Sequence, residues 1–272
     1  MLYQHWNPDQ PGFKALKQHP LYQNKLRQDI ESGDVFPALR THEIDFYHLG
    51  RKMFSFDGQR FRSNTFAFEL TENPNSEVTE TDLYDGFKQN TSQCQTPESE
   101  GVFHLCRDYS YASQKDADCM VLDIERSFVA LDSPDECDRV DLVLFRKSTK
   151  QLMFVAARCF DDQEPWPRAG SQPTVIQKVA RCKAQIAAAS REIVSSCADY
   201  VRIVNELLGT SLPIPESISP QVRLLVFGFS ENDGEDELRT RFKRDYNICA
   251  ITRGSLQRVT KPAISRYWWS EG

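Results

Sequence analysis

The sequence predicts an α/β fold with a mixed central sheet flanked by helices, together with a β-rich lobe at the N-terminus. Residues 140–145, 151–160 and 222–229 are apolar at both odd and even positions, which is typical of strands covered on both faces. Residues 174–190 carry apolar side chains at helical spacing, which predicts a helix flanking the sheet. Residues 36–70 alternate apolar and polar side chains, which predicts a separate strand meander.

The N-terminal part of the chain shows a helix, the meander and an acidic stretch. Residues 19–32 have apolar side chains at helical spacing and are followed by Gly33, a residue type that commonly ends helices. The meander breaks at residues 49–50 and 57–58, so we expect three strands in it. Residues 71–99 are polar and acidic, which predicts a long loop or linker.

We expect the chain to form two units, over residues 1–99 and 100–272. The first unit holds the helix, the meander and the acidic linker, and the second holds the mixed sheet and a basic C-terminal region. The elements expected in the second unit are, in chain order, a helix (101–113), three strands (120–131, 140–145 and 151–160), a long helical region (174–208), a strand (222–229), a helix (236–246) and a short strand (249–252).

The composition is that of a globular protein with reduced thiols. The 272 residues carry a net charge of −6 and eight cysteines without a CxxC pair, so no structural zinc site is predicted. No apolar run reaches the ~20 residues needed to cross a bilayer. The first residues lack the basic and apolar regions of a secretory signal. We therefore expect a cytoplasmic protein with no membrane contact.

Charge is distributed unevenly along the chain. Residues 69–100 hold eight acids and one base, whereas residues 239–269 hold eight bases and one acid. Aromatic residues are interleaved with the charges of the basic region, and this mixture suits phosphate contacts and base stacking. DNA is therefore an expected partner, although a solvated helix face would carry the same residue types. The candidate contacts in this region are Arg239, Arg241, Lys243 and Arg244.

Two neighbouring strands could carry a catalytic site. Asp141 lies on the first strand, and Ala156 and Arg158 lie on the second. Residues i and i+2 of a strand share a face, so the last two are expected to point together toward Asp141. Metal-dependent phosphodiester cleavage needs carboxylates that hold a divalent cation and a positive charge near the phosphate. The layout RVDLVLF…KQLMFVAAR, followed by the helix VIQKVARCKAQI, resembles the PD-(D/E)XK nuclease superfamily.

This resemblance implies a restriction-endonuclease-like core and a DNA endonuclease that cleaves phosphodiester bonds with Mg²⁺ or Mn²⁺, in genome defence or repair. Asp141 matches the motif aspartate, Ala156 falls on the motif glutamate and Arg158 falls on the motif lysine. Gln177 matches a helix glutamine that many RecB-like members carry. Of these, Asp141 would bind the metal and Arg158 would stabilise the charge that develops on the phosphate.

Further residues complete the expected site. Glu125, on the preceding strand, is the expected second metal ligand beside Asp141. Lys178 and Arg181, on the same helix as Gln177, are further expected contacts with DNA.

Alternatives remain open at the motif itself. Alanine at position 156 has no oxygen for a metal, and arginine at position 158 cannot be deprotonated. Asp141 and Arg158 would equally form a buried ion pair that neutralises both charges. The chain would then be a catalytically inactive nuclease-fold module that binds nucleic acid or, through its N-terminal lobe, a protein partner. Replacement of a natural glutamate would also produce Ala156.

Overall fold

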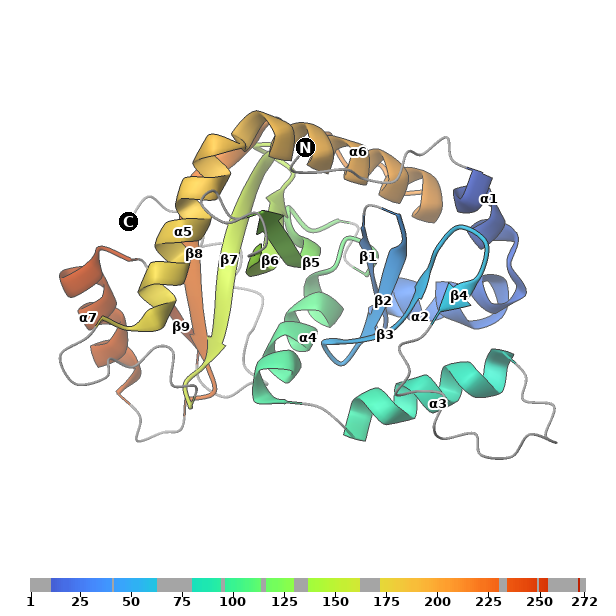
Figure 1. The fold of residues 1–272 in the computed structure, drawn as a ribbon, viewed down its shortest axis with the longest axis horizontal. Helices are drawn as coiled ribbons and strands as arrows, with labels where there is room; N and C mark the ends of the chain where they lie inside the picture. Colours follow the sequence, from blue (N-terminus) through green and yellow to red (C-terminus); the bar gives the residue numbers. More distant parts are fainter. Residues whose placement is uncertain are drawn as a thin grey trace.

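The protein folds around two β-sheets, one antiparallel and one mixed (Figure 1). The structure is a computed structural model. It describes residues 11–40, 42–62, 80–93, 96–113, 116–129, 137–161, 172–229, 234–248, 250–253 and Trp269. The predicted α/β class is confirmed, as is a mixed sheet with helices around it.

The antiparallel sheet contains four strands rather than the three that were predicted. These strands are β1 (Phe36–Leu39), β2 (Ile44–His48), β3 (Arg51–Phe56) and β4 (Phe61–Arg62). Both predicted breaks are confirmed, and Leu49 and Gly50 have φ angles of 50° and 72°, as a tight hairpin turn requires. The missed turn joins β1 to β2, where the backbone N–H of Arg40 donates to the carbonyl of Glu43 at 2.8 Å. No glycine or proline marks it in the sequence.

The N-terminal part also contains four helical segments. They are α1 (Pro11–Gln18), the π-helical turn η1 (Tyr22–Leu26), α2 (Arg27–Ser32) and α3 (Glu80–Gln93). Of these, α3 packs on strands β2 and β3. The expectation of a loop over residues 71–99 is wrong for α3, and residues 71–79 lie outside the described part. Tyr84 and Phe87 of α3 pack against Phe54, and the Tyr84 hydroxyl donates to Asp29. The side of this largely polar helix that faces the sheet therefore includes the buried Tyr84 and the partly buried Phe87.

The mixed sheet has the strand order β5-β6-β7-β8-β9. Its strands are β5 (Cys119–Val129), β6 (Cys137–Arg146), β7 (Gln151–Cys159), β8 (Ser217–Phe227) and β9 (Ala250–Arg253). Strand β6 is antiparallel to both of its neighbours, β5 and β7, and β7, β8 and β9 run parallel. The helices of this part are α4 (Pro97–Tyr109), α5 (Thr174–Ala188), α6 (Ser190–Leu208) and α7 (Glu235–Tyr246). Parallel neighbours need long crossover connections, which α5 with α6 and then α7 provide.

Helix α4 lies between the two sheets (Figure 1). Gly33 and Gly50 of the antiparallel part abut the backbone of α4 at Arg107 and Ser99, where a β-carbon would collide with a carbonyl oxygen. The carbonyl of Pro37 on β1 accepts from the hydroxyl of Tyr111 at 2.7 Å. The buried side chains of both sheets form one continuous hydrophobic core.

The predicted boundary between two units, at residues 99 and 100, falls in the first turn of α4. None of the described helices combines the length and the apolar character that a membrane crossing requires.

Candidate functional site

The expected site lies where strands β6 and β7 separate. Their ladder ends at the pair Leu142 and Val155, although β6 continues to pair with β5 and β7 continues to pair with β8. Asp141 is the first residue of β6 beyond this ladder. Its Oδ2 accepts a hydrogen bond from the backbone N–H of Ala157 at 2.7 Å, in place of a backbone carbonyl. A carboxylate therefore bridges the fork between the two strands.

Arg158 is the direct partner of Asp141. Its Nη1 lies 2.9 Å from Asp141 Oδ2 and also donates to the carbonyl of Ala157. Each residue of the pair is only 3% exposed. Arg158 thus reaches Asp141 across the fork, as the sequence periodicity predicts. Burial makes the pairing obligatory, because either charge alone would lose its hydration without compensation.

The second expected metal ligand, Glu125, is held by other groups. Its Oε2 accepts from the Tyr47 hydroxyl at 2.9 Å, and its Oε1 lies 3.0 Å from Arg139 Nη1. Glu125 has a φ angle of 49°, in the left-handed region that a residue with a β-carbon rarely adopts. Ala156 is 1% exposed and offers only a methyl group to the fork.

A Mg²⁺ or Mn²⁺ ion does not fit these donors. Such ions need carboxylate oxygens that can turn toward them, with water and phosphate in the remaining positions. Here a guanidinium already lies against the Asp141 oxygen, and a second cation there would be repelled. Among the described residues, no group of three or more His, Cys, Asp or Glu side chains is placed to hold a metal.

Helix α5 carries three expected site residues, and it does not bring them to the fork. Gln177 and Arg181 are exposed and Lys178 is half-buried. The face of α5 that packs on β6 and β8 is formed by other side chains. The apolar members of that face are Val175, Ile176, Val179, Cys182 and Ile186. Gln177 therefore points to solvent, not toward the Asp141–Arg158 pair.

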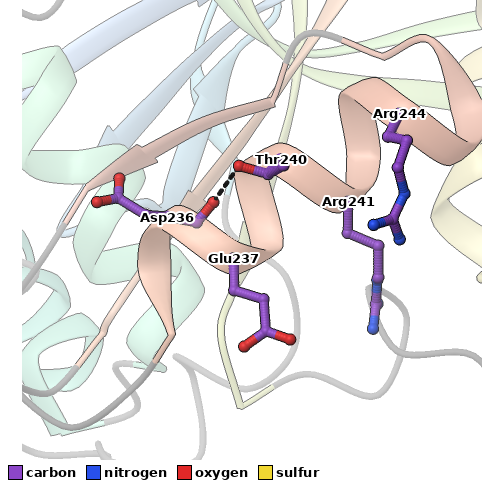
Figure 2. Close-up of a pocket in the computed structure, with 5 residues that line it drawn as sticks. All are labelled: Asp236, Glu237, Thr240, Arg241 and Arg244. Carbon is purple, nitrogen blue, oxygen red and sulfur yellow. Dashed lines mark hydrogen bonds between the residues drawn. The ribbon is translucent and has the colours of Figure 1, made fainter.

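The four basic residues of α7 that we expect to contact DNA lie among acidic side chains. Arg239 pairs with Asp236 at 2.9 Å, and Arg244 pairs with Asp245 at 2.6 Å. Residues 235–246 contain four acids and four bases, so the helix has no net charge. A pocket on its surface is lined by Asp236, Glu237, Thr240, Arg241 and Arg244, with the last two and Glu237 on one side (Figure 2).

Sequence reasoning missed a buried ionic network beside the fork. Arg40, which directly follows β1, lies 3.1 Å from Asp123 of β5, and Arg126 contacts the other oxygen of that carboxylate at 3.1 Å. Burial, the largest single influence, acts to lower the pKa of Arg40, but Asp123 together with Tyr47 and Asp45 outweighs burial, so this pKa lies well above its usual range. The signal was an acid and a base, Asp123 and Arg126, three residues apart on one predicted strand.

No protein-family model matches the chain, and comparisons with curated proteins and with solved structures also find no match. The resemblance to the PD-(D/E)XK superfamily therefore stays a prediction.

Proposed function

We propose that this protein is a nucleic-acid-binding module with a nuclease-like fold that does not cleave its ligand. The order of elements supports the fold assignment. Helix α4 is followed by β5, β6 and β7, then by the helical crossover and β8. This is the helix–three strands–helix–strand order that the sequence resemblance implies.

One observation supports the proposal that the protein does not cleave nucleic acid. Asp141, the only acid among the three motif positions, is neutralised at 2.9 Å by Arg158, and Ala156 adds no oxygen. A metal-activated water requires a bound cation, which these residues do not hold. Binding needs no such cation, because phosphate contacts come from surface bases alone.

The experiment measures binding and cleavage on the same samples. Fluorescently labelled duplex DNA, single-stranded DNA and RNA are titrated with the protein at several salt concentrations, with and without Mn²⁺. We expect the logarithm of the association constant to fall linearly with the logarithm of the salt concentration. We also expect the nucleic acid to be intact at the end of every incubation. Binding that is undetectable at low salt, or cleavage that depends on Mn²⁺, would contradict the proposal.

A metal-dependent DNA endonuclease is the second candidate. It is favoured by the placement of Asp141 and Arg158 at one fork, where the resemblance would put the motif residues. The test is the double variant Ala156→Glu, Arg158→Lys, incubated with plasmid DNA and Mn²⁺ beside the unchanged protein. If the unchanged protein cleaves, the second candidate replaces the first. Cleavage by the double variant alone would indicate a nuclease fold that has lost its chemistry.

A further inference from the structure

Helix α3 depends on its docking to the antiparallel sheet. It packs on β2 and β3 (Figure 1). Its large apolar side chains are Leu83, Tyr84 and Phe87, and half of its 14 residues are Thr, Asp, Gly, Asn or Ser, which have low helix propensity. An isolated helix of this length is marginal in water even when its sequence favours helix. The contacts with the rest of the protein therefore decide whether α3 is formed.

Lys88 fastens α3 to two acids of the N-terminal segment. Its Nζ lies 2.9 Å from Oδ2 of Asp29 and also contacts Oδ2 of Asp34. The hydroxyl of Tyr84, one helical turn before Lys88, donates to the same Asp29 oxygen. The side chains of Lys88 and Asp29 are 23% and 24% exposed. One ammonium group therefore neutralises two partly buried carboxylates.

The two acids belong to a part of the backbone that is held without α3. The N–H of Val35 donates to the carbonyl of Asp29 at 3.0 Å, and the carbonyl of Asp34 lies 2.9 Å from Nδ1 of His48 on β2. Between the two acids, Gly33 abuts the backbone of α4. Removal of α3 would leave all of these contacts in place. The surface that receives Lys88 is therefore fixed by α2, β2 and α4.

A second lysine also joins α3 to the N-terminal helices. Lys25 of η1 pairs with Asp85 of α3 at 2.9 Å, and the two side chains are 38% and 58% exposed. Pairs as exposed as this one contribute little to stability. Lys88 and Lys25 therefore form a matched comparison, because both bind acids across the same junction and only the Lys88 contact is largely shielded from water.

We propose that α3 is a releasable strap, which detaches from β2 and β3 as a unit while both sheets stay folded, and that Lys88 holds it closed. Elements with few buried apolar contacts open at a lower free-energy cost than the core of the same protein. Release of Lys88 leaves Asp29 and Asp34 without their shared cation, which opposes opening. This device is independent of the proposed function.

Opening of the strap uncovers an aromatic surface. Phe54 is 2% exposed, and its ring lies 5.9 Å from that of Tyr84 and 5.7 Å from that of Phe87, measured between centroids. The same ring lies 5.3 Å from both Phe46 and Phe61. The closed strap therefore hides one edge of a phenylalanine cluster, and its release controls access to that edge.

Hydrogen exchange of the full-length protein, followed by mass spectrometry of overlapping peptides, tests the strap at urea concentrations below the unfolding transition. Peptides that cover residues 80–93 should exchange faster than those of β6 and β7. They should also share one shallow dependence on urea, because opening as a unit exposes a small common surface. Exchange of α3 that depends on urea as steeply as that of β6 and β7 would mean that it opens only with the whole protein, and would overturn the proposal. Exchange without any dependence on urea would indicate fraying of single turns and would also overturn it.

Two matched variants test the role of Lys88. Lys88→Met keeps the apolar stem and removes the charge, so it should speed exchange of α3 about tenfold and leave β6 and β7 unchanged. Lys25→Met is the control and should leave the exchange of α3 as it is in the unchanged protein. Equal acceleration of all peptides in Lys88→Met would show that Lys88 stabilises the whole fold and does not hold a strap. The same acceleration of α3 in both variants would show that net charge, not the Lys88 contact, sets the opening.

Discussion

The guanidinium of Arg40 lies 3.1 Å from the carboxylate of Asp123, and this contact joins the antiparallel sheet to the mixed sheet. The side chains are 20% and 4% exposed. We predict that Arg40→Met destabilises the protein by about 3 kcal/mol, because the change leaves a buried carboxylate with one of its two cations. Arg126 still contacts Asp123, which places the loss at the lower end of the range for broken buried pairs. Urea unfolding followed by circular dichroism measures this loss.

Arg27→Met is the matched control for this change. Arg27 is 61% exposed and pairs with Glu31 one helical turn away on α2. Exposed pairs of this kind contribute little to stability, so we expect Arg27→Met to leave the free energy of unfolding nearly unchanged. Similar losses for the two variants would show that the Arg40 contact does not hold the sheets together.

The Asp141–Arg158 pair gives a second prediction, which uses a double-mutant cycle. Arg158→Met should cost about 3–5 kcal/mol, because it leaves the Asp141 charge buried without a partner. The double variant Asp141→Leu, Arg158→Met should cost much less than the sum of the single changes, because no uncompensated charge remains. Additive losses in the cycle would show that the two side chains act independently and would argue against the ion pair.

The fold could be predicted from the sequence wherever both faces of an element are apolar. Residues 151–160 were predicted as a strand, and β7 spans Gln151–Cys159. Helix α3 was missed because its apolar face consists of little more than Tyr84 and Phe87, too few for a periodic signal. The turn between β1 and β2 contains no glycine or proline, so the sequence pattern predicts one strand where the structure has two.

The candidate site could be predicted only in part. Asp141 and Arg158 are 17 residues apart on adjacent strands, and strand periodicity is enough to bring them to one face. Arg40 and Asp123 are 83 residues apart, and they meet because two sheets pack together, which no local pattern encodes. The engagement of Glu125 by Tyr47 depends on the same packing. Sequence reasoning therefore found the Asp141–Arg158 pair and missed the contacts that occupy Glu125 and Asp123.

Thiol reactivity provides a third prediction. Burial raises the pKa of Cys119 to about 11 and that of Cys197 to about 12, so both thiols stay protonated at pH 8. Because the thiolate is the reactive form, alkylation by iodoacetamide should be slow for both in the folded protein and fast in denaturant. Peptide mass spectrometry after a timed reaction measures each site. Rapid labelling of Cys197 in the folded protein would contradict its burial on α6.

The last prediction concerns two glycines in helices. A β-carbon at Gly101 of α4 would lie 2.5 Å from the ring of Phe227 on β8, so Gly101→Ala forces helix and strand apart. We expect it to destabilise the protein by about 1–3 kcal/mol, as overpacked cores do. Gly86→Ala is the control within α3, where a β-carbon meets no other atom within 4 Å. There alanine should stabilise the helix by about 0.5–1 kcal/mol through its better helix propensity.

The same pair of positions also tests the proposed cause of the loss. Phe227→Leu removes part of the ring that the new methyl group would meet, so it should recover part of the stability lost in Gly101→Ala. Combined with Gly86→Ala, the same Phe227→Leu change should show only its own cost, because the two positions do not share a contact. Urea unfolding of the three single and two double variants measures both couplings. A Gly101→Ala protein as stable as the unchanged one would mean that α4 does not pack closely on β8.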